Sequence, residues 1–78
     1  MRIMRKLSEL DVVEVVESNP NIPGASVGDQ GAILLVFGNP NNPEAYEVEC
    51  VLENGSNKWE GTFLPFQLKL VTKYDKNT

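Results

Sequence analysis

The stretch GASVGDQGAILLVFG, residues 24–38, decides the fold of this chain. Glycines at 24, 28 and 31 precede an apolar run, but their spacing fits neither a dinucleotide-binding loop nor a P-loop, and no lysine follows them. A bound phosphate would also meet the carboxylate of Asp29, with no helix N-terminus to hold it. We therefore interpret the glycines as turn residues. Gly28 and Gly31 can take positive φ, Asp29 can bond the backbone two residues on, and Gly31 can mark a sharp bend in a strand.

Strand-like patterns recur along the whole chain. They occupy residues 11–17, 30–38, 46–52, 58–64 and 68–72, separated by proline- and asparagine-rich loops at 18–29 and 39–45 and by a break at 65–67. Residues 1–10 form either a short helical turn or a lead-in to the first strand. The 78 residues therefore predict one all-β domain, a five-stranded SH3-like barrel with its core in 7–72 and a flexible tail at 73–78.

The pair Asn54-Gly55 predicts the clearest β-hairpin of the chain. A two-residue turn there sets Glu49 opposite Glu60, two like charges, so we prefer a four-residue turn, which sets Glu49 opposite Thr62. Both registers give the same two faces. The core face carries Tyr46, Val48, Cys50, Leu52, Trp59, Gly61 and Phe63, and the solvent face carries Glu47, Glu49, Val51, Lys58, Glu60, Thr62 and Leu64.

The segment 30–38 is apolar on both of its sides. One face carries Ile33, Leu35 and Phe37, and the other carries Ala32, Leu34 and Val36. A strand with two apolar faces is usually covered on both. Either the N-terminal side chains Ile3, Met4 and Leu7 supply the second cover, or a partner protein or a second copy of the chain does.

The charge of the chain is unevenly distributed. The net charge is −4, but residues 9–60 hold ten acidic residues against one lysine, a net charge of −9 for that segment. Such a surface repels nucleic acid and attracts basic partners, or it serves solubility alone. We therefore expect no nucleic-acid partner, and an RNA-binding role is disfavoured.

Few residue types in the chain support catalysis. It has no histidine, and its one cysteine, Cys50, falls on the predicted core face, where we interpret it as a small hydrophobe. Glu47, Glu49 and Glu60 could approach a divalent cation, but a flat sheet face lacks the six or more oxygens of a calcium site. We expect no enzyme, no cofactor and no metal. Trp59 and Phe63 are expected in the core, and Phe66 is the exposed aromatic candidate.

The sequence also suggests where the protein acts. A single cysteine excludes an internally disulfide-bonded secreted scaffold. The longest apolar run is far shorter than the roughly 20 residues of a membrane helix, and the N-terminus lacks the apolar stretch of a signal peptide. We expect a cytoplasmic protein with no membrane partner.

Four segments resemble a known family of small bacterial proteins. These are LSELDVVEVVES (7–18), GDQGAI (28–33), AYEVECVLENG (45–55) and LPFQLKLV (64–71), and together they are similar to domain of unknown function 4926. The chain departs from that pattern at Cys50, where phenylalanine is usual, and at Trp59–Gly61. The resemblance implies an SH3-like fold without an established activity. It also implies a small accessory protein, some members of the family resembling companions of a second small protein, as an antitoxin or immunity factor would be.

These observations predict a non-enzymatic protein-interaction module. A basic partner protein is expected on an acidic sheet face formed by Glu47, Glu49 and Glu60, or on the apolar face of Leu34 and Val36, with Phe66 as a further contact. An antitoxin or immunity-type inhibitor of a basic toxin is the sharpest form of this hypothesis. The alternative is a structural homo-oligomer, such as a homodimer, that assembles through Ala32, Leu34 and Val36.

Overall fold

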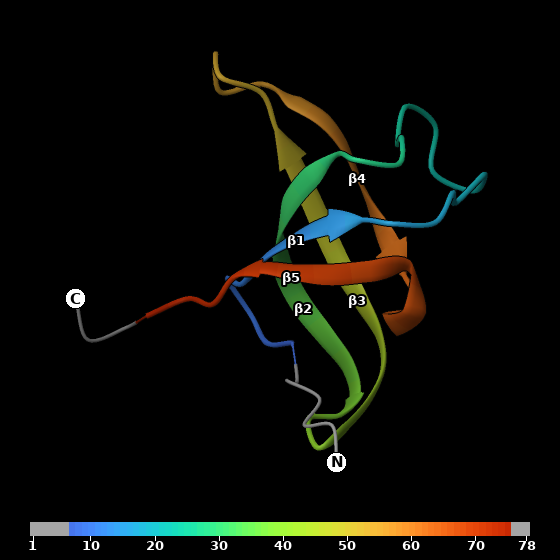
Figure 1. Ribbon diagram of the computed structural model, residues 1–78, viewed down its shortest axis with the longest axis vertical. Helices are drawn as coiled ribbons and strands as arrows, with labels where there is room; N and C mark the ends of the chain where they lie inside the picture. Colours follow the sequence, from blue (N-terminus) through green and yellow to red (C-terminus); the bar gives the residue numbers. More distant parts are fainter. Residues whose placement is uncertain (1–6, 76–78) are drawn as a thin grey trace.

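The computed structural model describes residues 7–75, which form five strands and one turn of 3₁₀ helix (Figure 1). The strands are β1 (Val12–Val15), β2 (Gln30–Asn39), β3 (Asn42–Val51), β4 (Asn57–Phe63) and β5 (Leu68–Thr72), and the 3₁₀ turn η1 (Pro65–Gln67) joins β4 to β5. The predicted all-β class is confirmed, and no α-helix occurs within residues 7–75. The expected helical turn at 1–10 lies mostly outside the described residues.

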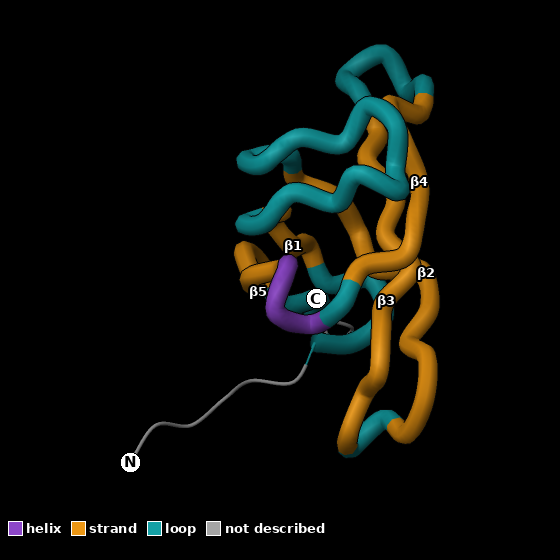
Figure 2. The backbone as a smooth tube through the Cα atoms, turned by 90° about the vertical axis from the view of Figure 1, so that its right-hand side faces the viewer, coloured by secondary structure: helices purple, strands orange, loops and turns teal. Residues whose placement is uncertain are grey.

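The five strands form one antiparallel sheet in the order β4-β3-β2-β1-β5. The sheet is not closed into a barrel, because β4 and β5 are its two edges and do not pair with each other, so the predicted barrel closure is wrong. Figure 2 shows β2, β3 and β4 as one layer, with β1 and β5 on one side of it. The strand β2 belongs to both parts, because its first residues pair with β1 and the rest pairs with β3.

The hydrophobic core lies between these two parts of the sheet. It consists of Val13, Val15, Ile22, Ile33, Tyr46, Val48, Cys50, Trp59, Phe63 and Leu68. The predicted core face of the β3–β4 hairpin is confirmed for all its large side chains except Leu52, which is 45% exposed because the chain already turns there. The rings of Trp59 and Phe63 pack at a centroid distance of 5.3 Å.

Gly31 lies where the backbone of β2 passes close to β3. A Cβ atom at this position would lie 2.5 Å from the backbone oxygen of Glu49 and 2.9 Å from a methyl group of Val48. The bulge expected at Gly31 lies instead at Leu34, and Gly31 allows a close backbone approach that only glycine permits. The positive φ expected at Gly31 is wrong, whereas Gly28 has φ 97° as expected.

The turn between β3 and β4 differs from the preferred four-residue turn. The backbone N–H of Gly55 donates to the oxygen of Leu52 (2.9 Å), and the N–H of Leu52 donates to Ser56 (2.8 Å). Gly55 has φ 90°, so this is a three-residue loop ended by a left-handed glycine. A bulge in β4 then sets Glu49 opposite Glu60. The turn chemistry therefore outweighs the repulsion between these two exposed carboxylates and decides the register.

The expected loop at 39–45 is also wrong, because it is mostly strand. Asn39 pairs with Asn42 across a two-residue turn, and β3 begins at Asn42. The Asn39 side chain accepts a hydrogen bond from the N–H of Asn41 (2.8 Å), an Asx turn that reverses the chain within four residues. The result is a long β2–β3 hairpin that extends beyond the core (Figure 1).

The loop at 18–29 lies along the free edge of β4. The Asn19 side chain donates to the oxygen of Thr62 (3.0 Å), and Ile22 is buried where a side chain at Gly61 would otherwise lie. Gln67 donates to the oxygen of Ser18 (3.3 Å). Proteins commonly cover an edge strand in this way, which prevents pairing with another chain.

Candidate functional site

A β-bulge in β2 determines which side chains reach the surface. Ile33 pairs with Val48 and Leu35 pairs with Glu47, so Leu34 is one residue too many for the ladder. Beyond this bulge, each side chain of β2 lies on the face opposite to the one that simple alternation from Ile33 predicts. Val36 packs against the core, while Leu35 and Phe37 are 50% and 40% exposed.

This exchange corrects the prediction that Ile33, Leu35 and Phe37 share one face. It also separates Leu34 from Val36, which the sequence grouped together as a partner-binding face. Leu34 is the half-buried bulge residue, and Val36 faces the core beside Tyr46. A run of consecutive apolar residues has no alternation, so nothing in the sequence marks the bulge.

The side of β2, β3 and β4 that faces away from the core carries Leu35, Phe37, Glu47, Glu49 and Glu60; we call it the outer face. Glu47 lies between Leu35 of β2 and Thr62 of β4, and Glu49 lies between Ala32 and Glu60. Figure 2 shows this layer with no described segment on its outer side. The structure therefore brings together the three glutamates that the sequence proposed.

The three carboxylates of the outer face interact with one another. A hydrogen bond with Glu47, helped by partial desolvation and by the negative charges of Glu47 and Glu49, raises the pKa of Glu60. Glu47 also accepts a hydrogen bond from the hydroxyl group of Thr62 (2.7 Å). The outer face is thus a site where negative charge is crowded and where a cation would relieve the repulsion.

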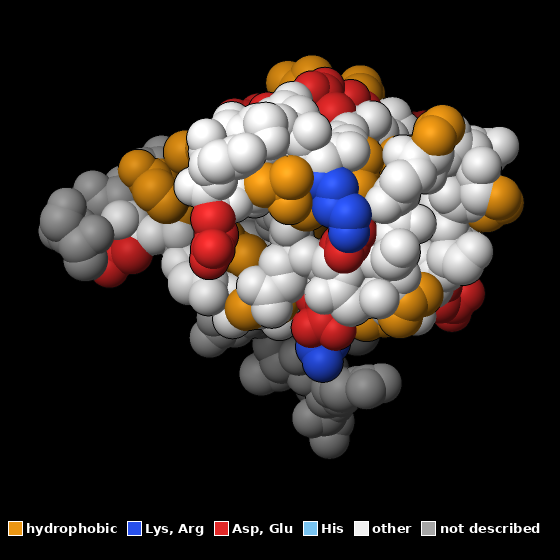
Figure 3. All heavy atoms as spheres, turned by 90° about the horizontal axis from the view of Figure 1, so that it is seen from above, with side chains coloured by type: hydrophobic (Ala, Val, Ile, Leu, Met, Phe, Trp, Pro, Cys, Tyr) orange, Lys and Arg blue, Asp and Glu red, His pale blue; other side chains and the backbone are white. Residues whose placement is uncertain are grey.

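Two lysines of the described chain form ion pairs away from the outer face. Lys58 pairs with Asp29 (2.9 Å) and Lys73 pairs with Asp11 (2.8 Å). Within residues 7–75 no ion pair involves Glu47, Glu49 or Glu60. In the view of Figure 3, acidic side chains lie on several sides and hydrophobic ones in small separate groups.

Phe66 does not belong to the β2–β4 layer. It lies in η1, between β4 and β5, and its side chain is 60% exposed. The expectation of an exposed aromatic residue at this position is confirmed. The structure gives no sign that it joins the glutamates in one surface.

Asp29 links the loop at 18–29 to β4 through hydrogen bonds. Its carboxylate accepts hydrogen bonds from the indole N–H of Trp59 (2.7 Å), from Lys58 (2.9 Å) and from the backbone N–H of Ser26 (3.0 Å). Burial opposes its ionisation, but these hydrogen bonds outweigh that effect and lower the pKa of Asp29. The sequence suggested that the Asp29 side chain bonds the backbone two residues on. It instead accepts a hydrogen bond from the backbone N–H of Ser26, three residues back.

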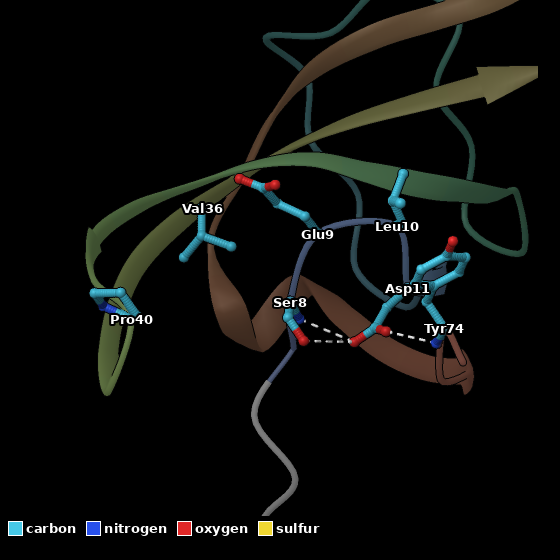
Figure 4. Close-up of a pocket in the computed structure, with 7 residues that line it drawn as sticks. All are labelled: Ser8, Glu9, Leu10, Asp11, Val36, Pro40 and Tyr74. Atoms are coloured by element: carbon cyan, nitrogen blue, oxygen red, sulfur yellow. Dashed lines mark hydrogen bonds between the residues drawn. The ribbon is translucent and has the colours of Figure 1, made fainter. Parts of the chain in front are cut away.

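A cleft that the sequence did not predict lies between residues 8–11, Tyr74 and the side chains of Val36 and Pro40 (Figure 4). It has a volume of about 630 Å³ and is lined by Ser8, Glu9, Leu10, Asp11, Val36, Pro40 and Tyr74. Leu10 is 49% exposed and has φ 73°, a left-handed conformation that is unusual for leucine. The cleft joins residues from the beginning, middle and end of the chain, so no local motif could reveal it.

Asp11 forms the buried polar centre beside this cleft. Its carboxylate accepts hydrogen bonds from Lys73 (2.8 Å), from the N–H of Tyr74 (2.8 Å) and from the N–H of Ser8 (2.9 Å). Burial opposes ionisation, yet these bonds prevail and lower the pKa of Asp11. Residues 73 and 74, which the sequence places in a flexible tail, are thereby held against β1.

Residues 7–75 also bear on metal binding, thiol chemistry and membrane insertion. Within 7–75, no group of three or more histidine, cysteine or acidic side chains is arranged to hold a metal ion. Cys50 is buried, and burial raises the pKa of its thiol, which makes it a poor nucleophile. No helix in this part of the chain is long and apolar enough to span a membrane.

No family model, curated protein or solved structure matches the chain.

Proposed function

We propose that this chain is a non-enzymatic protein-interaction module that holds a basic partner protein on its outer face. One observation carries the proposal: Glu47, Glu49 and Glu60 lie together on a sheet face that no other part of residues 7–75 covers, and within those residues they form no ion pair. Opposite charges on a partner would be attracted over long distances and would speed association. An antitoxin or immunity-type protein that inhibits a basic toxin is the sharpest form of the proposal.

We also infer a relationship to SH3-like folds. Support comes from the strand order β4-β3-β2-β1-β5 and from the single 3₁₀ turn before the last strand. The open edge between β4 and β5 is the point of difference. Membership in domain of unknown function 4926 and a cytoplasmic location remain predictions from the sequence.

The homo-oligomer remains the second candidate, on different residues. Val36 packs against the core, so a second copy would use Leu35 and Phe37, which are half exposed, in place of Leu34 and Val36. Light scattering over a range of concentrations tests this candidate. A monomeric mass at the highest concentration would remove it.

The test of the leading proposal uses two matched variants. Glu47→Gln, Glu49→Gln and Glu60→Gln together neutralise the outer face, while Glu9→Gln, Glu17→Gln and Glu53→Gln remove the same charge at exposed positions elsewhere. With the purified partner, affinity should fall and its salt dependence should flatten in the first variant alone. Equal losses in both variants would indicate net charge and would contradict an outer-face site.

A further inference from the structure

We infer that the outer face selects an amphipathic partner segment, one that presents an apolar side chain next to lysine or arginine. The inference rests on the proposed function and adds the chemistry of the partner. Its source is the bulge at Leu34, which moves Leu35 and Phe37 to the side of the sheet that carries the glutamates. Bulges are used in this way to redirect side chains near binding sites.

The outer face consists of an apolar half and an acidic half that touch. Leu35 lies directly opposite Glu47 in the ladder, which places their Cβ atoms about 5 Å apart. Phe37 continues the apolar half toward the β2–β3 turn, opposite Ala45. In the other direction Glu49 follows Glu47 on β3 at about 7 Å, as alternate residues of a strand do. A partner that fits must therefore present an apolar side chain to Leu35 and a basic side chain to the neighbouring Glu47.

The same arrangement argues against a second copy as the occupant. The exposed apolar side chains of this face, Leu35 and Phe37 with Val51 beyond Glu49, cover far less than the roughly 800 Å² that each partner buries in a stable interface. A symmetric dimer would have to extend over Glu47, Glu49 and Glu60, and would bring like charges together or bury them against leucine and phenylalanine. A segment with both basic and apolar side chains avoids the like-charge repulsion and the burial of glutamate against apolar side chains.

Two short synthetic peptides of equal charge test the inference. One repeats two lysines and two leucines and the other repeats two lysines and two serines, so that each face of an extended peptide carries both residue types, and each is titrated into the ¹⁵N-labelled protein. We expect the leucine peptide to bind about tenfold more tightly, because it covers apolar surface as well as charge. The amide signals of Leu35, Phe37, Glu47 and Glu49 should shift most.

Variants locate the effect on the outer face. Leu35→Ser with Phe37→Ser should abolish the tenfold difference, while Val27→Ser with Val71→Ser, at exposed positions elsewhere, should preserve it. The amide spectra of the free variants establish whether both are folded.

The remaining outcomes separate this inference from the proposed function. Equal binding of the two peptides at the glutamates would overturn the inference and leave the proposed function standing. No binding of either peptide to the outer face would overturn both. Concentration-dependent shifts of Leu35 and Phe37 in the free protein, with a dimeric mass, would show that the occupant is a second copy.

Discussion

The indole N–H of Trp59 donates a hydrogen bond of 2.7 Å to the carboxylate of Asp29, joining β4 to the loop before β2. Trp59 is only 5% exposed, so its indole N–H is poorly solvated if this acceptor is removed. Asp29→Ala should lower the free energy of unfolding by about 1–3 kcal/mol, because it leaves a buried donor unpaired. Urea unfolding followed by tryptophan fluorescence measures this. Asp29→Asn, which keeps an acceptor oxygen, should cost less, and an equal cost would contradict the role of the indole bond.

Asp11 should make the free energy of unfolding depend on pH in the acid range. Its pKa is lowered in the folded state, so it stabilises the fold above its ordinary value of 3.8 and that contribution disappears as the pH falls through the lowered pKa. Asp11→Asn should therefore cost about 2 kcal/mol at neutral pH, through the lost charged hydrogen bonds, and progressively less below about pH 4. Unfolding at a series of pH values checks this. A cost independent of pH would show that the carboxylate acts by shape alone.

The two glycines of the GDQG stretch should respond differently to substitution. At Gly31 a methyl group would lie 2.5 Å from the backbone oxygen of Glu49, whereas at Gly28 no atom lies within 4 Å but φ is 97°. Gly31→Ala should therefore cost at least about 3 kcal/mol and Gly28→Ala about 1 kcal/mol. Thermal unfolding of both variants gives the comparison. Similar small losses would mean that β2 does not approach β3 as closely as described.

Leu10 holds a left-handed conformation that glycine would adopt without strain. With φ 73° and half of its side chain exposed, Leu10→Gly should raise the free energy of unfolding by about 0.5 kcal/mol, while Leu10→Ala should not. Chemical denaturation of the two variants tests this. A loss of stability in Leu10→Gly would indicate that the leucine side chain is needed where it borders the cleft.

Local patterns were sufficient to place the five strands. The ends of β2, β4 and β5 fall within one residue of the predicted segments, because alternation and turn residues are encoded locally. The barrel closure, the hairpin register and the faces of β2 beyond Leu34 were not predictable in this way. Each depends on a bulge or an edge, and an apolar run such as ILLVF gives no sign of the extra residue.

The candidate site was predictable in part. The shared face of Glu47, Glu49 and Glu60 follows from strand parity, which both hairpin registers preserve. That Leu35 and Phe37, in place of Leu34 and Val36, form the apolar half of the outer face was not predictable, because the bulge at Leu34 decides it. Asp11 and Asp29 were also missed as polar centres, since their partners lie far away in the sequence, Lys73 for Asp11 and Trp59 for Asp29.

The most direct test of the outer-face proposal is capture of partners from the native cell extract at low and high salt, read by mass spectrometry. The baits are the wild-type chain, the outer-face variant of Glu47, Glu49 and Glu60, and the variant neutralised at Glu9, Glu17 and Glu53. We predict one basic protein in stoichiometric amount on the wild-type and control baits, released by high salt and absent from the outer-face variant. Equal capture of that protein by all three baits would contradict the proposal.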